Sequence, residues 1–156
     1  GQGLVDQSRG TIVNRPLVIL GPAIAEPGKS ACPLYVSPVQ AGWPSPGEDY
    51  AEEKINLHKI AVKNPPATFF LRATGDSMLG CGIHDGDLLV VDRSLDARHN
   101  RVVIAALDRG LVIKRLIRRK NRVYLAPANP KYPEIDITTR EYVHIWGIVT
   151  YVLHKL

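Results

Sequence analysis

Residues 68–78, Thr-Phe-Phe-Leu-Arg-Ala-Thr-Gly-Asp-Ser-Met, join an apolar run to a turn that contains glycine. The run Thr68–Ala73 has the composition of a β-strand, and the turn after it carries one serine, Ser77. A serine placed there is presented at a strand end, where catalytic and binding residues concentrate. Ser77 is therefore a candidate functional residue, although serine also favours turns for its local hydrogen bonding alone.

A lysine lies inside a second β-like run, Leu111–Ile117. Period-2 alternation puts Lys114 on the same strand face as Val112 and Leu116, where an ammonium group is poorly solvated. A lysine in such a place can act as a base. The opposite face of the run is nearly as apolar, so the alternation leaves open which face is buried. A strand lysine can also be an edge residue or extend its amine to solvent.

Further segments occur in a fixed order around these two residues. Gly75-Asp-Ser-Met precedes Gly82-Ile-His-Asp-Gly-Asp-Leu-Leu-Val-Val-Asp92, and Val112-Ile-Lys-Arg-Leu116 follows. In this order the chain resembles the self-cleaving Ser/Lys peptidases of the LexA and UmuD family, from about residue 38 to its end. Downstream, Leu125–Tyr132 and Ile145–Val149 resemble the closing strands of that family.

The resemblance also supplies a cleavage site and a mechanism. Residues 39–46 resemble the cleavage segment of the family and contain a small-residue bond, Ala41-Gly42. The resemblance implies that Ser77 attacks the Ala41 carbonyl, that neutral Lys114 takes the hydroxyl proton, and that the Ser77 N–H stabilises the oxyanion. Burial must then lower the lysine pKa by ~3 units, worth ~4 kcal/mol.

The rest of the chain predicts a mainly-β fold. Besides the two runs above, strands are expected in four segments: 87–91, 101–106, 122–125 and 142–153, the last with a candidate break at Gly147. Turns are expected at 108–110 and 119–121, and a short helix at Leu57–Val62 with Asn56 as its cap. The resemblance makes this the β body of a LexA C-terminal domain.

An extended, proline-rich arm precedes this body. Seven of the twelve prolines fall within residues 1–46, too closely spaced for helix. Within the arm, 11–13 and 17–20 are expected as edge strands, 23–29 as a loop, and 45–50 as a helical turn. An extended segment is also what a protease cleft binds best. We expect an arm of residues 1–41 that cleavage removes and a peptidase-like domain of residues 42–156.

Composition sets bounds on the other functions. The 156 residues are 45% hydrophobic, enough for one core, and the two cysteines, Cys32 and Cys81, lack metal-ligand spacing. No histidine has an obvious partner, so we expect neither a metal nor a cofactor. No apolar run reaches the ~18 residues needed to span a bilayer, so we expect a soluble cytoplasmic protein. The net charge of +5 is mildly basic.

Basic residues gather around one predicted hairpin turn. They are Lys114, Arg115, Arg118, Arg119, Lys120 and Arg122. Such a cluster can contact a phosphate backbone or an acidic partner, or it can simply keep the surface soluble. Direct nucleic-acid binding is therefore left open.

The resemblance implies a UmuD-like protein of the SOS response. Such a protein cleaves itself with stimulation by a RecA filament on single-stranded DNA, and its shortened form is a homodimeric accessory subunit of a Y-family translesion polymerase. The alternative is a LexA-like or phage-type self-cleaving repressor fragment that lacks its DNA-binding domain, because a repressor needs a DNA-reading helix-turn-helix, which the proline-rich arm cannot form. A type I signal peptidase would need a membrane anchor. A non-catalytic binding module is opposed only by the presence of both Ser77 and Lys114.

Overall fold

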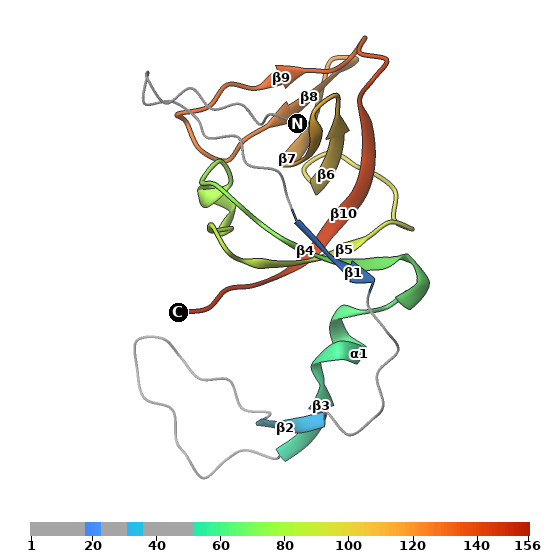
Figure 1. Cartoon of the computed structure of the whole chain (residues 1–156), viewed down its shortest axis with the longest axis vertical. Coiled ribbons are helices and arrows are strands. Elements are labelled where there is room, and N and C mark those ends of the chain that lie inside the picture. Colours follow the sequence, from blue (N-terminus) through green and yellow to red (C-terminus); the bar gives the residue numbers. More distant parts are fainter. Residues whose placement is uncertain (1–17, 23–30, 36–51) are drawn as a thin grey trace.

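The computed structural model describes residues 18–22, 31–35 and 52–156, with side chains from Asn56 onward. This part of the chain is mainly antiparallel β-sheet, as predicted, with one short α-helix (Figure 1). The strands are β1 (Val18–Pro22), β2 (Ala31–Tyr35), β3 (Glu52–Asn56), β4 (Thr68–Arg72), β5 (Leu88–Asp92), β6 (Val102–Leu107), β7 (Gly110–Arg119), β8 (Arg122–Ala126), β9 (Ile135–Asp136) and β10 (His144–Leu153). The helix is α1 (Leu57–Ala61).

Eight strands form one sheet in the order β1-β4-β5-β10-β6-β7-β8-β9. Strand β10 holds the sheet together, because its first half pairs with β6 and its second half with β5. Figure 1 shows it as the long red strand that runs through both halves of the body. The break expected at Gly147 does not occur; the strand continues, with a register shift between Ile145 and Gly147. The shift lets one strand follow two partners.

Two hydrophobic clusters cover the sheet. The first is built mainly by β4, β5 and the turn after β4, and includes Leu71, Met78 and Leu89. The second is built mainly by β6, β7 and β8, and includes Leu116 and Leu125. Neighbouring residues of β6 belong to different clusters, Val103 to the second and Ile104 to the first, and both are fully buried. The middle of the sheet is therefore covered on both faces.

Local sequence signals account for several elements. The Asn56 side chain accepts the His58 N–H at 2.9 Å and caps α1, as predicted. Lys120 and Asn121 both have positive φ, 48° and 65°, and form the two-residue turn between β7 and β8. That geometry matches the right-handed twist of the flanking strands. Strand β1 is an edge strand paired with β4, as expected for this part of the arm.

One hairpin was not predicted. Strands β2 and β3 pair antiparallel from Ala31 opposite Asn56 to Tyr35 opposite Glu52. No local pattern indicated this pairing, since Pro33 lies in one strand and three charged residues lie in the other. The predicted elements at 11–13, 23–29 and 45–50 lie outside the described residues, as does the boundary at 41 and 42. Among the described helices, none has the length and apolar character needed to cross a bilayer.

Gly147 provides a test of this packing. A Cβ added there would lie 2.6 Å from Cγ1 of the fully buried Val91, inside van der Waals contact. We predict that Gly147→Ala lowers the free energy of unfolding by about 1–3 kcal/mol, measured by urea denaturation. His144→Ala changes an exposed residue of the same strand and serves as the control. Equal urea midpoints for the two variants would contradict the prediction, because they would show that Val91 moves aside without loss of stability.

Candidate active site

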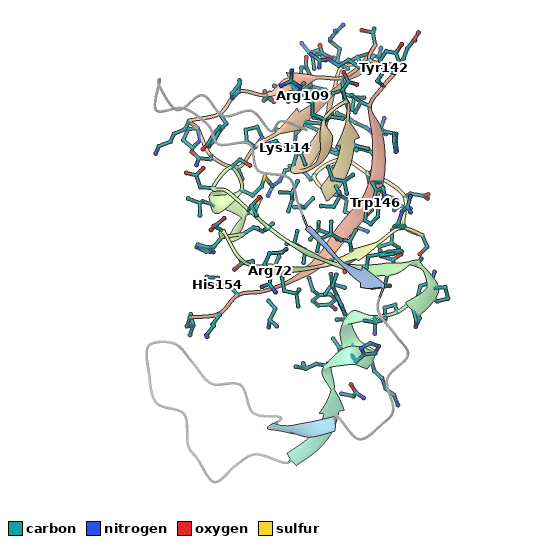
Figure 2. All side chains as sticks on the ribbon, in the orientation of Figure 1. Arg72, Arg109, Lys114, Tyr142, Trp146 and His154 are labelled. Carbon is teal, nitrogen blue, oxygen red and sulfur yellow. The ribbon has the colours of Figure 1, made fainter. Side chains whose placement is uncertain are left out.

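Ser77 and Lys114 lie in contact. The Lys114 Nζ is 3.0 Å from the Ser77 Oγ, which is hydrogen-bond distance. Ser77 belongs to the turn between β4 and the short 3₁₀ helix Leu79–Cys81, whereas Lys114 lies near the middle of β7. Figure 2 labels Lys114 in the upper half of the body, where Figure 1 labels β6 and β7. The structure thus brings together two residues that are 37 positions apart in the sequence.

Backbone hydrogen bonds shape the turn that carries Ser77. Gly75 adopts a positive φ of 86°, and its N–H donates to the Asp85 Oδ1 at 2.7 Å. The Ala73 N–H donates to the Asp87 carbonyl, and the Gly86 N–H donates to the Ala73 carbonyl, both at 2.8 Å. Residues 73–75 are therefore bound to residues 85–87. The Met78 side chain is buried in the first hydrophobic cluster and anchors the other end of the turn.

A loop after β8 holds the serine turn from another side. The Ala128 N–H donates to the Ser77 carbonyl at 2.7 Å, and the Gly80 N–H donates to the Ala128 carbonyl at 2.6 Å. The Asn129 side-chain amide donates to the Asp76 carbonyl at 2.9 Å, and the Tyr132 hydroxyl donates to the Asp76 carboxylate. Sequence reasoning identified this segment only as a family resemblance. Its hydrogen bonds show that it fixes the backbone of Ser77.

Burial governs the charge state of the lysine. Desolvation lowers the pKa of Lys114 below its ordinary value of 10.5, because the charged ammonium is disfavoured away from water. The described part of the chain places no carboxylate within ion-pair distance of its Nζ that would oppose this effect. The lysine is thus shifted toward the neutral amine, the form that accepts a proton.

Both faces of β7 contact apolar side chains, which explains why the alternation in the sequence did not identify the buried face. Val112 and Leu116 pack in the second hydrophobic cluster, while Ile113 packs in the first. Both faces of the strand therefore carry apolar contacts. The tertiary contact with Ser77, which no local pattern contains, distinguishes Lys114 from an ordinary strand lysine.

The remaining ionisable candidates are paired in other ways. Arg119 forms an ion pair with Glu134, and Arg122 forms one with Asp136. The Thr138 hydroxyl and N–H, followed by Arg122, lower the pKa of Asp136 to about 2. The basic hairpin is therefore partly neutralised. Cys81 is a free thiol whose sulfur accepts a hydrogen bond from the Arg115 guanidinium.

The expectation that no histidine has a partner was wrong. His154 Nδ1 lies 2.6 Å from one carboxylate oxygen of Asp87, and His84 lies beside the other. His99 accepts a hydrogen bond from the Arg118 N–H. These pairings join segments that are distant in sequence, so spacing alone could not reveal them. None of them involves Ser77. The side chains of Cys32, Ala41 and Gly42 lie outside the described residues.

Comparison with known proteins shows which proteins the chain is similar to. A family model described as Peptidase S24-like matches residues 33–150. Protein MucA of Escherichia coli is 45% identical over 122 residues, which are 78% of this chain and 83% of that protein. Protein SamA of Salmonella typhimurium is 43% identical over 130 residues, which are 83% of this chain and 90% of that protein.

A LexA repressor is also similar, over a shorter stretch. The repressor of Syntrophotalea carbinolica is 45% identical over 85 residues, which are 54% of this chain and 42% of the repressor. The similarity to MucA and SamA thus extends over more of both proteins than the similarity to this repressor.

Gly80 tests whether the loop after β8 holds the serine turn. A Cβ at this position would lie 2.5 Å from the backbone oxygen of Ala128, so the two loops would have to separate. We predict that Gly80→Ala raises the amide exchange rate of Ala128 at least about tenfold, because its hydrogen bond to Ser77 lengthens. Leu79→Ala, which removes an exposed side chain in the same turn, is the matched control. Unchanged Ala128 exchange would contradict this role.

Proposed function

The chain belongs to the peptidase S24-like family as a UmuD-like member that acts in the SOS response, and from this premise we propose that Ser77 and Lys114 cleave its own Ala41-Gly42 bond. The observation that carries the proposal is the 3.0 Å separation of the Lys114 Nζ and the Ser77 Oγ. The lowered pKa of Lys114 supports the same assignment, since it favours the amine that can act as a base.

The proposed reaction is an acyl transfer followed by hydrolysis. Neutral Lys114 takes the proton of the Ser77 hydroxyl while the oxygen attacks the Ala41 carbonyl carbon. The resulting ammonium gives its proton to the nitrogen of Gly42 as the peptide bond breaks, and Ala41 is left as an ester on Ser77. Water, deprotonated by Lys114, then hydrolyses the ester. The Ser77 N–H is the proposed donor to the oxyanion.

The serine turn has the rigidity that this chemistry requires. The Ala128 N–H donates a hydrogen bond to the Ser77 carbonyl. The preceding residue, Asp76, accepts hydrogen bonds through both its backbone carbonyl and its carboxylate. The Ser77 backbone is therefore held in place without help from substrate. Preorganisation of this kind lowers the entropy cost of reaching the transition state.

Cleavage would divide the chain into an arm, residues 1–41, and a peptidase-like domain, residues 42–156. In this proposal the shortened form is a homodimer that acts as an accessory subunit of a Y-family polymerase in translesion synthesis. A RecA filament on single-stranded DNA stimulates the cleavage by promoting docking of the arm in the active site. A repressor function is less well supported, because the similarity to a LexA repressor covers only 42% of that protein.

The first functional prediction is self-cleavage. We expect the purified chain to split slowly into fragments that end at Ala41 and begin at Gly42, and RecA filaments to accelerate the reaction. Ser77→Ala and Lys114→Met each abolish it, while Lys120→Met, at an exposed turn, cleaves at the normal rate. Intact-mass spectrometry over time measures all four proteins. Cleavage of either dyad variant at the normal rate would disprove the assignment.

The second functional prediction concerns pH. The fraction of neutral lysine rises with pH until the pKa of the folded protein is passed, so the spontaneous cleavage rate should rise and then level off. Because burial lowers the pKa of Lys114, the plateau should begin below pH 10.5. Lys114→Arg, which stays charged, should be inactive throughout. The measurement is the rate of appearance of the Gly42 N-terminus from pH 6 to 10. A rate independent of pH above 7 would exclude Lys114 as the titrating base.

A further inference from the structure

Two histidines and one aspartate meet at the start of β5, beside the turn that follows β4. His84 and Asp87 lie in the turn that precedes β5, and His154 directly follows β10. Strands β5 and β10 pair antiparallel, with Leu88 opposite Leu153. The same ladder therefore brings the next residues outward, Asp87 and His154, next to each other. Figure 2 labels His154 apart from Lys114, so the cluster is distinct from the Ser77–Lys114 pair, although residues 85–87 are also hydrogen-bonded to the serine turn.

The three side chains direct their polar atoms toward one point. The His154 Nδ1 is 2.6 Å from the Asp87 Oδ1, and the His84 Nδ1 is 3.7 Å from the Asp87 Oδ2. The two imidazole rings stack with centroids 4.3 Å apart and planes inclined by 27°. One potential ligand atom from each residue lies within 4.8 Å of the other two.

A buried carboxylate beside two partly exposed histidines is the combination that a metal site requires. The Asp87 side chain is only 2% exposed, so its carboxylate is fixed, whereas the His84 and His154 side chains are 46% and 39% exposed. An ion can therefore reach the site from solvent. The Asp87 carboxylate accepts the His84 N–H through Oδ2, and its Oδ1 lies 2.6 Å from the His154 Nδ1, so both of its oxygens are oriented toward the two histidines.

Ordinary structural roles explain part of this arrangement. Asp87 accepts the His84 N–H at 2.7 Å, which stabilises the turn, and His154 covers the other carboxylate oxygen. These bonds do not account for the His84 ring, whose Nδ1 is too far from Asp87 for a hydrogen bond yet faces the same carboxylate. Two nitrogens and one carboxylate oxygen form a ligand set typical of Zn²⁺ and related divalent ions.

We propose that His84, Asp87 and His154 bind a divalent transition-metal ion of the Zn²⁺ class. Ligand atoms bound at about 2.0–2.2 Å in a tetrahedral site lie roughly 3.4 Å apart. The His84 Nδ1 is 3.7 Å from the Asp87 Oδ2, which approaches this value. The His154 Nδ1 is 2.6 Å from the other oxygen, Oδ1, and must withdraw by about 1 Å to make room for the ion. Water completes the coordination.

The surroundings define the expected strength and effect of binding. The Arg72 guanidinium donates to the carbonyl of Gly86, next to Asp87, and its positive charge opposes the ion. Binding should therefore be weaker than in a closed four-ligand structural site. The ion would join the end of β10 to the turn that also holds Gly75 through Asp85. Binding to the folded state alone should raise the Tm in a manner that chelation reverses.

The test is a Zn²⁺ titration of the metal-free full chain against a chromogenic chelator, with Tm measured in parallel. We expect one Zn²⁺ per chain. His84→Ala and His154→Gln should each weaken binding at least about tenfold, a loss at least as large as that of an outer-shell partner. His154→Gln keeps a hydrogen-bond donor toward buried Asp87, so it preserves the fold. His144→Ala and Cys81→Ser control for other histidines and for the free thiol.

Two outcomes would overturn the proposal. One is a wild-type chain whose Tm does not change when Zn²⁺ is added and which does not compete with the chelator for Zn²⁺. The other is Zn²⁺ binding that His84→Ala and His154→Gln leave within about twofold of wild type, with His144→Ala or Cys81→Ser carrying the loss instead. Neither readout depends on self-cleavage, so the result is independent of the function proposed for Ser77 and Lys114.

Discussion

The chemical role of the contact between the Lys114 amine and the Ser77 hydroxyl depends on the burial of the lysine in the sheet, away from water. A solvated lysine would be charged at neutral pH and could only donate to the hydroxyl, whereas desolvation shifts it toward the form that accepts a proton. Burying the amine costs free energy. Apolar contacts on both faces of β7 offset this cost, with Ile113 in one hydrophobic cluster and Leu116 in the other. The same packing of β7 therefore forms part of the hydrophobic core and lowers the pKa of Lys114.

The serine needs a different kind of support. Ala73 and Met78 bury the two ends of its turn in the first hydrophobic cluster, and backbone hydrogen bonds to residues 85–87 and to Ala128 fix the turn between them. The segment before β5 reaches the turn because β4 and β5 are neighbours in the sheet, whereas the segment after β8 reaches it although β5, β10, β6 and β7 lie between β4 and β8 in the sheet order. Glycines permit the close approach, through positive φ at Gly75 and through the absence of a Cβ at Gly80.

The sequence predicted the features that are local or carried by family motifs. Alternating apolar runs gave the strands of the body, and Asn56 gave the cap of α1. The motifs identified Ser77 and Lys114, which the fold then brings within 3.0 Å. It could not predict features that depend on distant pairing. Strands β2 and β3 lack alternation, and the His154–Asp87 contact follows from the register of β10 on β5.

The pKa of Lys114 tests the central claim most directly. It can be measured by NMR titration of lysine Cε and Nζ signals in a Ser77→Ala background, in which self-cleavage is not expected, with Lys114 assigned by Lys114→Met. The account predicts that Lys114 titrates clearly below the ordinary value of 10.5 and below the exposed Lys120 in the same spectra. A Lys114 that titrates together with Lys120 would show that the sheet does not desolvate the amine and would contradict the account.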